Sequence, residues 1–258
     1  MKKTLFFLFA LTVLPAASLS SALENGCIEG DCQNGFGSMV FPNGSRYEGE
    51  FQEGKYSGRG IFYFANGSIY EGEYKHGSYH GQGSFIYVNG SKYVGEFKNG
   101  EYHGIGTFTF ANGANYSGQY YKSNIDGQGT FTYADGSRYT GEFKNGSKEG
   151  HGILMHADGS KYTGEFKNGV YHGQGVYIFS TREQYSGSFK DGTIDGQGTF
   201  TYADGSRYTG QFKSGKRNGH GIYTEPDGTK YSGKFKDDGF MDYDLLISEN
   251  KTILKRNQ

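Results

Sequence analysis

The chain has 258 residues, including 45 Gly, 23 Tyr and 21 Phe, but only 3 Pro and no Trp. The glycines have no three-residue period and Pro is scarce, which excludes a collagen-like chain. Lys and Arg total 26 against 27 Asp and Glu, so the chain lacks the strong positive charge of a general nucleic-acid binder.

Residues 1–22 are predicted to be a cleaved secretory signal peptide. Met1–Lys3 is a short basic start, Leu5–Leu14 is apolar except for Thr12, and small residues up to Ala22 mark the cleavage site. A membrane anchor is the alternative, but so short an apolar segment cannot cross a hydrocarbon core of about 30 Å. We therefore expect an exported protein without a transmembrane helix, located in the periplasm, at the cell surface or outside the cell.

Residues 23–34 are expected to form an N-terminal cap, and they contain both cysteines of the chain, Cys27 and Cys32. Two cysteines this close together in an exported protein are typical of a local disulfide. A metal site is the alternative, but it needs about four ligands and this segment offers two thiols. We expect a disulfide, and no metal or other cofactor.

Residues 35–236 repeat with a period of 23 residues. Each period has a Tyr, a Gly two residues later, a Phe or Tyr two residues after that, and a Gly-x-Gly pair. The repeated tyrosines are Tyr47, Tyr70, Tyr93, Tyr116, Tyr139, Tyr162, Tyr185, Tyr208 and Tyr231. A fixed period of this length predicts an array of about nine similar units rather than a domain built around one pocket.

Each unit is predicted to be one antiparallel β-hairpin. Thr130–Tyr133 and Arg138–Lys144 alternate polar side chains with aromatic ones or Gly, which is the period of a strand. Asp135-Gly136 between them is a strong hairpin signal because such a turn needs positive φ angles, and Asn145-Gly146 marks a second turn. The rings would face inward, and Gly141 would leave room for a ring to cross the backbone.

The segment from Tyr139 to Gly146, with a Gly-x-Gly stretch such as His103–Phe110, resembles the MORN repeat. The resemblance covers about 200 residues and eight or nine copies. It implies an all-β, elongated, single-layer array of stacked hairpins that acts as a scaffold or binding surface. Some family members are linked to phospholipid head groups. The Trp that usually follows Gly-Glu in the family is Phe or Tyr here.

Outward positions are predicted to form two charged columns. Glu50, Glu73, Glu96, Glu142 and Glu165 share one slot, and the candidate binding residues Lys75, Lys98, Tyr121, Lys144, Lys167, Lys190 and Lys213 share the slot two residues further on. One interpretation is a solvated face that prevents edge pairing, and the other is an electrostatic stripe for a partner. Ser180–Glu183 and Ser188 depart from the repeat, through drift or because a partner requires it.

Three histidines of the repeat are candidate catalytic residues. His80, His103 and His172 precede Gly-x-Gly pairs, and Asp126, Glu149, Asp195 and Asn218 fill the same slot in other units. A slot that accepts all these side chains is typical of a turn residue. The chain contains no nucleophile elbow, P-loop or zinc-protease motif, so we expect no enzymatic activity.

Residues 237–258 leave the repeat and are expected to cap the array, with a docking peptide as the alternative. The function expected from the sequence is a non-catalytic scaffold that binds a protein or another cell-envelope component. Phospholipid head-group binding through the Lys column is the first alternative, and an enzyme acting on glycans or cell wall is the second. Nucleic acid is not an expected partner, and the sequence leaves the oligomeric state open.

Overall fold

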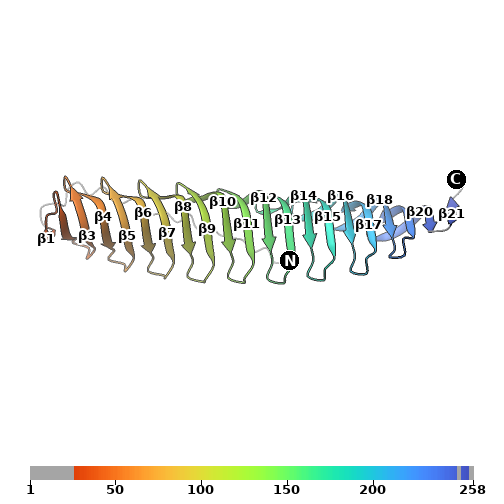
Figure 1. Cartoon of the computed structure of the whole chain (residues 1–258), viewed down its shortest axis with the longest axis horizontal. Coiled ribbons are helices and arrows are strands. Elements are labelled where there is room, and N and C mark those ends of the chain that lie inside the picture. Colours follow the sequence, from red (N-terminus) through yellow and green to blue (C-terminus); the bar gives the residue numbers. More distant parts are fainter. Residues whose placement is uncertain (1–25, 249–250, 256–258) are drawn as a thin grey trace. The chain divides into compact units, whose positions relative to one another are not determined.

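The structure is a computed structural model that describes residues 26–248 and 251–255, with side chains described as far as Asp242. Strands and turns make up these residues, and Figure 1 shows their order. They divide into two units. Unit 1 comprises residues 26–134 and 143–146, and unit 2 comprises residues 135–142, 147–248 and 251–255. The predicted signal peptide, residues 1–22, lies outside the described residues.

Unit 1 contains β1 to β10. Their bounds are β1 Cys27–Gly30, β2 Phe36–Val40, β3 Arg46–Gln52, β4 Lys55–Tyr63, β5 Ile69–Lys75, β6 Ser78–Ile86, β7 Lys92–Lys98, β8 Glu101–Thr109, β9 Asn115–Tyr121 and β10 Asn124–Thr132. Each strand pairs antiparallel with the next along the chain.

Strand β11, Arg138–Lys144, has residues in both units, and unit 2 continues to β21. The bounds are β12 Ser147–Met155, β13 Lys161–Lys167, β14 Val170–Ile178, β15 Gln184–Lys190, β16 Thr193–Thr201, β17 Arg207–Lys213, β18 Lys216–Thr224, β19 Lys230–Lys236, β20 Gly239–Ser248 and β21 Lys251–Lys255. From β12 onward, consecutive strands again pair antiparallel. The prediction of an all-β fold of stacked hairpins is confirmed.

Two kinds of turn alternate along the array. The tight turns have two residues with positive φ, as at Asn99 (53°) and Gly100 (84°), which fits the right-handed twist of the flanking strands. At the other kind of turn, the loop around the first Asx-Gly pair of each unit, here called the Asx-Gly loop, only the Gly has a positive φ, as at Gly90 (83°), and the Asn89 carboxamide accepts a hydrogen bond from the Ser91 N–H at 2.9 Å. The positive φ predicted for the Asx-Gly turn is found at its Gly, and the tight turn with two positive-φ residues is the second turn of each unit.

Strands β4, β6, β8, β10, β14, β16 and β18 are longer than the odd-numbered strands that precede them because each contains a bulge. Between β5 and β6, Gly72 lies opposite Gly83 and Glu73 opposite His80, so Gly81 and Gln82 are not paired with β5. Both residues do pair with the following strand, β7. A bulge bends the strand that contains it, and its repetition curves each hairpin around the rings on its inner face.

The core is a line of stacked rings. The Tyr70 ring stacks on Tyr79 with 3.9 Å between ring centroids, and it makes edge contacts with Tyr74 at 5.1 Å and with Phe97 at 5.0 Å. Eight of the repeated tyrosines have no exposed surface: Tyr47, Tyr70, Tyr93, Tyr116, Tyr139, Tyr162, Tyr185 and Tyr208. Tyr231 is half-buried, since no ring of a following unit packs on it within the described residues.

Both ends of the array differ from the repeat. The predicted disulfide is confirmed, because Cys27 and Cys32 are joined beside β1. At the other end β20 pairs with β19, and β21 pairs with β20. The predicted terminal segment, residues 237–258, therefore adds one further pair of strands.

Candidate interaction surfaces

The hydroxyl groups of the repeated tyrosines have a structural role. The Tyr70 hydroxyl donates a hydrogen bond to the Glu73 carbonyl at 2.9 Å, and the other fully buried tyrosines make the same bond within their own strands. Burial raises the pKa of Tyr162, Tyr185 and Tyr208 to about 12. These hydroxyls therefore stay protonated and stabilise the odd-numbered strands opposite the bulges of their partners.

Side chains of the predicted Glu column stabilise the bulges by accepting hydrogen bonds from them. Glu73 Oε1 accepts a hydrogen bond from the Gln82 N–H at 3.1 Å, and Glu165 Oε1 accepts one from the Gln174 N–H at 2.7 Å. Gln119 does the same for Gln128 at 2.6 Å, so the interaction needs an oxygen and not a charge. In the described residues these carboxylates form no ion pair with the Lys column, although the two columns lie on the same face of the sheet.

Side chains at the sequence position of the candidate catalytic histidines stabilise the tight turns. Asp126 Oδ2, Glu149 Oε2 and Asp195 Oδ2 each accept a hydrogen bond from the first positive-φ residue of the next tight turn, at 2.9 to 3.2 Å. His172 Nδ1 lies 4.0 Å from Asp191 Oδ1. His80 and His103 occupy the equivalent positions on β6 and β8.

The candidate binding lysines lie at the ends of strands, next to the tight turns. Lys75, Lys98, Lys144, Lys167, Lys190 and Lys213 are all exposed, and the structure records no ion pair for them among the described residues. Tyr121 is 55 % exposed in the same slot, with the Lys122 Nζ 5.5 Å from its ring centroid. The register places these side chains on the face opposite the ring core, here called the outer face.

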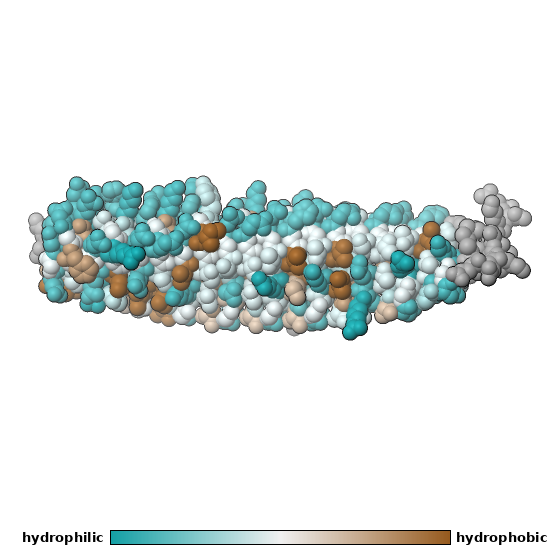
Figure 2. All heavy atoms as spheres, viewed as in Figure 1, coloured by the Kyte–Doolittle hydropathy of each residue, from teal (hydrophilic) through white to brown (hydrophobic). Residues whose placement is uncertain are grey.

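An uncharged row crosses the outer face of unit 2. Cross-strand pairing aligns Ile153, Thr163, Val176, Ser186, Thr199, Thr209, Ile222 and Ser232. Figure 2 shows pale and brown surface over this part of the sheet. We call these residues the central row.

Basic side chains flank the central row on both sides. Beside the tight turns lie Lys167, Lys190, Lys213 and Lys236, which we call the turn-side row. Beside the Asx-Gly loops lie Lys161, Arg207 and Lys230, which we call the loop-side row. The acidic side chains Glu142, Glu149, Glu165 and Asp195 on this face each accept a hydrogen bond from a backbone N–H group, and the basic side chains of the two rows outnumber them. The outer face of unit 2 is therefore basic.

The outer face of unit 1 has a different charge pattern. At positions equivalent to the central row, unit 1 has Glu48 and Glu71. They lie on either side of Ile61, and each is paired with it. Arg46 forms an ion pair with Glu48. Acidic and basic side chains are therefore mixed on the outer face of unit 1, and the outer face of unit 2 is the more basic of the two.

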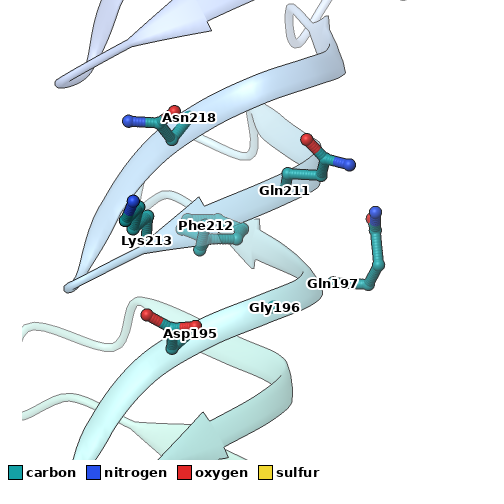
Figure 3. A pocket seen from close by; sticks show the side chains of 7 residues that line it. All are labelled: Asp195, Gly196, Gln197, Gln211, Phe212, Lys213 and Asn218. Carbon is teal, nitrogen blue, oxygen red and sulfur yellow. The ribbon is translucent and has the colours of Figure 1, made fainter.

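A shallow depression of about 270 Å³ lies on unit 2 among β16, β17 and β18. Figure 3 shows its lining residues, with Asp195, Lys213 and Asn218 on one side and Gln197 and Gln211 on the other. It lies beside Ser188, which replaces a long side chain of the Glu column and packs against Gly196. The depression is part of the basic outer face.

The inner face carries a second repeated surface, an aromatic stripe beside the Asx-Gly loops. In unit 1 its rings are Phe41, Phe62, Phe64, Phe85, Tyr87, Phe108, Phe110, Phe131 and Tyr133, with neighbouring centroids 4.5 to 5.9 Å apart. Phe64, Tyr87, Phe110 and Tyr133 are half-buried. The alternation of residues predicts only that these rings face inward, and no sequence signal indicates that part of the stripe is accessible.

Within the described residues, no cluster of His, Cys, Asp or Glu side chains has the geometry of a metal site. The same residues include no helix that could span a membrane.

Nine MORN repeats match the chain, at residues 33–46, 47–69, 70–92, 93–114, 116–138, 139–161, 162–182, 185–207 and 208–230. The chain belongs to the MORN-repeat family. A MORN-repeat array of this kind is a scaffold or binding module. No curated protein matches the chain in sequence.

Two solved structures with a similar fold are TCP10 domains of Danio rerio CPAP. One, in complex with a peptide of Danio rerio STIL, is 18% identical over 86% of this chain and 99% of that chain, with a TM-score of 0.49. The other, without the peptide, is 16% identical over 82% of this chain and 99% of that chain, with a TM-score of 0.45. These likenesses carry no inference about what the MORN array binds.

Proposed function

We propose that this MORN-repeat protein is an exported, non-catalytic scaffold whose outer face on unit 2 binds an acidic protein partner in the cell envelope. The composition of residues 1–22 supports export, and the Cys27–Cys32 disulfide fits an oxidising compartment. The observation that carries the partner assignment is the pair of basic rows on either side of the uncharged central row.

The dimensions of this face favour a protein partner. Lys161 and Lys167 lie six residues apart on one strand, which places the loop-side and turn-side rows roughly 20 Å apart. A folded protein can contact both rows at once, whereas a single extended peptide is too narrow. Complementary charge would speed the encounter and set the orientation, and the central row would supply the uncharged contact.

A matched pair of charge reversals tests this proposal. Lys167→Glu with Lys190→Glu changes the turn-side row of unit 2, and Lys75→Glu with Lys98→Glu changes the same slot in unit 1. The purified mature protein is cross-linked to an envelope extract, the captured partner is identified and purified, and its Kd is then measured. We expect the unit 2 variant to bind roughly tenfold more weakly and the unit 1 variant to bind almost normally. Equal weakening, or capture of no acidic protein, would contradict the proposal.

Anionic lipid head groups are the second candidate partner, because the turn-side lysines are exposed and could contact a membrane surface. Sedimentation with phosphatidylglycerol vesicles at low and high salt tests this directly. Salt-sensitive sedimentation that is lost in the unit 2 variant, without capture of a protein, would replace the protein proposal. Hydrolysis of glycan or cell-wall material by the purified protein would contradict the non-catalytic assignment.

A further inference from the structure

The aromatic stripe of unit 1 contains no charged side chain, and its rings Phe64, Tyr87, Phe110 and Tyr133 are partly exposed. Four loops along its margin, Phe41–Ser45, Phe64–Ser68, Tyr87–Ser91 and Phe110–Ala114, contain no charged residue, whereas the loop that begins at Tyr133 contains Asp135. The corresponding loops of unit 2 contain Asp158, Arg182, Glu183, Asp204, Glu225 and Asp227. The absence of charge along the unit 1 stripe therefore suits an uncharged partner. The charged loops of unit 2 make its stripe less suitable.

The stripe also offers polar groups at a regular interval. Asn43, Asn66, Asn89 and Asn112 are exposed in the loops beside it. Their Oδ1 atoms accept backbone hydrogen bonds within the loops, which fixes each carboxamide in place. The Nδ2 amide of each side chain is a donor, and one such donor recurs in each of these four loops of unit 1.

The spacing of equivalent rings along the stripe is close to the length of one turn of a polyproline II helix. Phe64, Tyr87, Phe110 and Tyr133 are equivalent positions separated by two strands, so they recur about every 9.6 Å. A polyproline II helix completes one turn of three residues in about 9.3 Å. A ligand with proline at every third residue would therefore present one proline ring to each aromatic position over several repeats.

We propose that the aromatic stripe of unit 1 binds an uncharged, proline-rich peptide in the polyproline II conformation. Proline rings would pack on the exposed parts of Phe64, Tyr87 and Phe110, and the Asn Nδ2 groups would donate hydrogen bonds to the peptide carbonyls. A polyproline II peptide exposes its carbonyls and loses little conformational entropy on binding. This site is distinct from the basic outer face of unit 2, so the scaffold would hold two different partners.

The probe is a synthetic uncharged peptide of about 12 residues with proline at every third position, which spans roughly 37 Å in this conformation. A peptide of the same composition with proline at every fourth position is the control for period. Affinities are measured by fluorescence anisotropy with the mature protein. We expect the three-residue period to bind several-fold more tightly, because only it keeps register with the aromatic positions. Absence of binding, or equal binding of both peptides, would overturn the proposal.

Matched variants locate the site. Phe64→Leu with Phe110→Leu removes two rings of the stripe but retains apolar volume, and Phe179→Leu with Tyr202→Leu makes the same change at equivalent slots in unit 2. The first pair should weaken peptide binding roughly tenfold and the second should leave it unchanged. Circular dichroism checks that both variants fold. Equal effects of the two pairs, or tighter binding of a neutral chitin oligosaccharide than of the peptide, would overturn the proposal. Neither variant alters the basic rows, so this test can fail while the proposed function stands.

Discussion

The Tyr70 ring lies across the backbone of Gly83 in the neighbouring strand, in the space that a side chain at Gly83 would need. A Cβ atom at Gly83 would lie 2.6 Å from the Tyr70 hydroxyl oxygen and 2.9 Å from its Cζ atom. Because Tyr70 has no exposed surface, its ring has little freedom to move aside. The Gly-x-Gly pair and the tyrosine of each repeat therefore depend on each other.

Gly83→Ala should lower the free energy of unfolding by about 2–4 kcal/mol, because the new methyl group overlaps a ring that is packed on all sides. Urea denaturation measures the change. Gly90→Ala is the matched control: Gly90 has a φ of 83° but no atom within 4 Å of a Cβ, so only about 1 kcal/mol of backbone strain is expected there. Equal losses in the two variants would show that the ring contact is unimportant.

Arg182→Gly should stabilise the protein by about 1 kcal/mol. Arg182 has a φ of 74° in the turn where other units have Gly, as at Gly205 (φ 89°), and this conformation strains a residue that has a Cβ atom. The measurement is again the free energy of unfolding. Thr181→Gly, at a neighbouring residue without a positive φ, should give no such gain. Unchanged or reduced stability of the Arg182 variant would refute the prediction.

Glu73→Ala should cost about 1–2 kcal/mol of folding free energy, because it removes the acceptor of the Gln82 N–H group at the bulge. Glu73→Gln should cost much less, since Gln119 already fills the equivalent role through its carboxamide oxygen. Thermal or urea unfolding distinguishes the two variants. If Gln proved as destabilising as Ala, the carboxylate charge would be the important property.

The Asx-Gly loops of unit 2 should make stability depend on pH in the acid range. Hydrogen bonds from the Ser206 hydroxyl and N–H lower the pKa of Asp204 below its ordinary value of 3.8, and similar bonds from Ser160 lower the pKa of Asp158. A lowered pKa in the folded state adds stability that is present above 3.8 and is lost as the pH falls through the folded-state value. Unfolding followed from neutral to strongly acidic pH should show this loss.

Asp158→Asn with Asp204→Asn provides the control for the pH experiment. Unit 1 has Asn in this slot, and Asn89 makes the same bond to a backbone N–H without titrating. The double variant should therefore lose less stability on acidification than the natural chain. An identical acid profile would place the titrating groups elsewhere in the molecule.

The amino-acid sequence by itself determined the period, the strands and the buried tyrosines, because a repeat of alternating polar and aromatic residues has few ways to bury its rings. It also indicated the disulfide between Cys27 and Cys32. It did not reveal that Glu73 bonds to the backbone of Gln82, or that the tight turn is the second one of each unit, since both depend on where the bulge falls in the register.

The tertiary structure alone decided which side chains gather on one surface. Lys161, Lys167 and Arg207 are scattered in the sequence, and the strand register brings them to the two sides of the central row. The stripe from Phe41 to Tyr133 becomes visible only when ring contacts and exposure are known. The physical reason is that alternation along a strand specifies the face of a residue, whereas its neighbours across strands depend on register, bulges and packing.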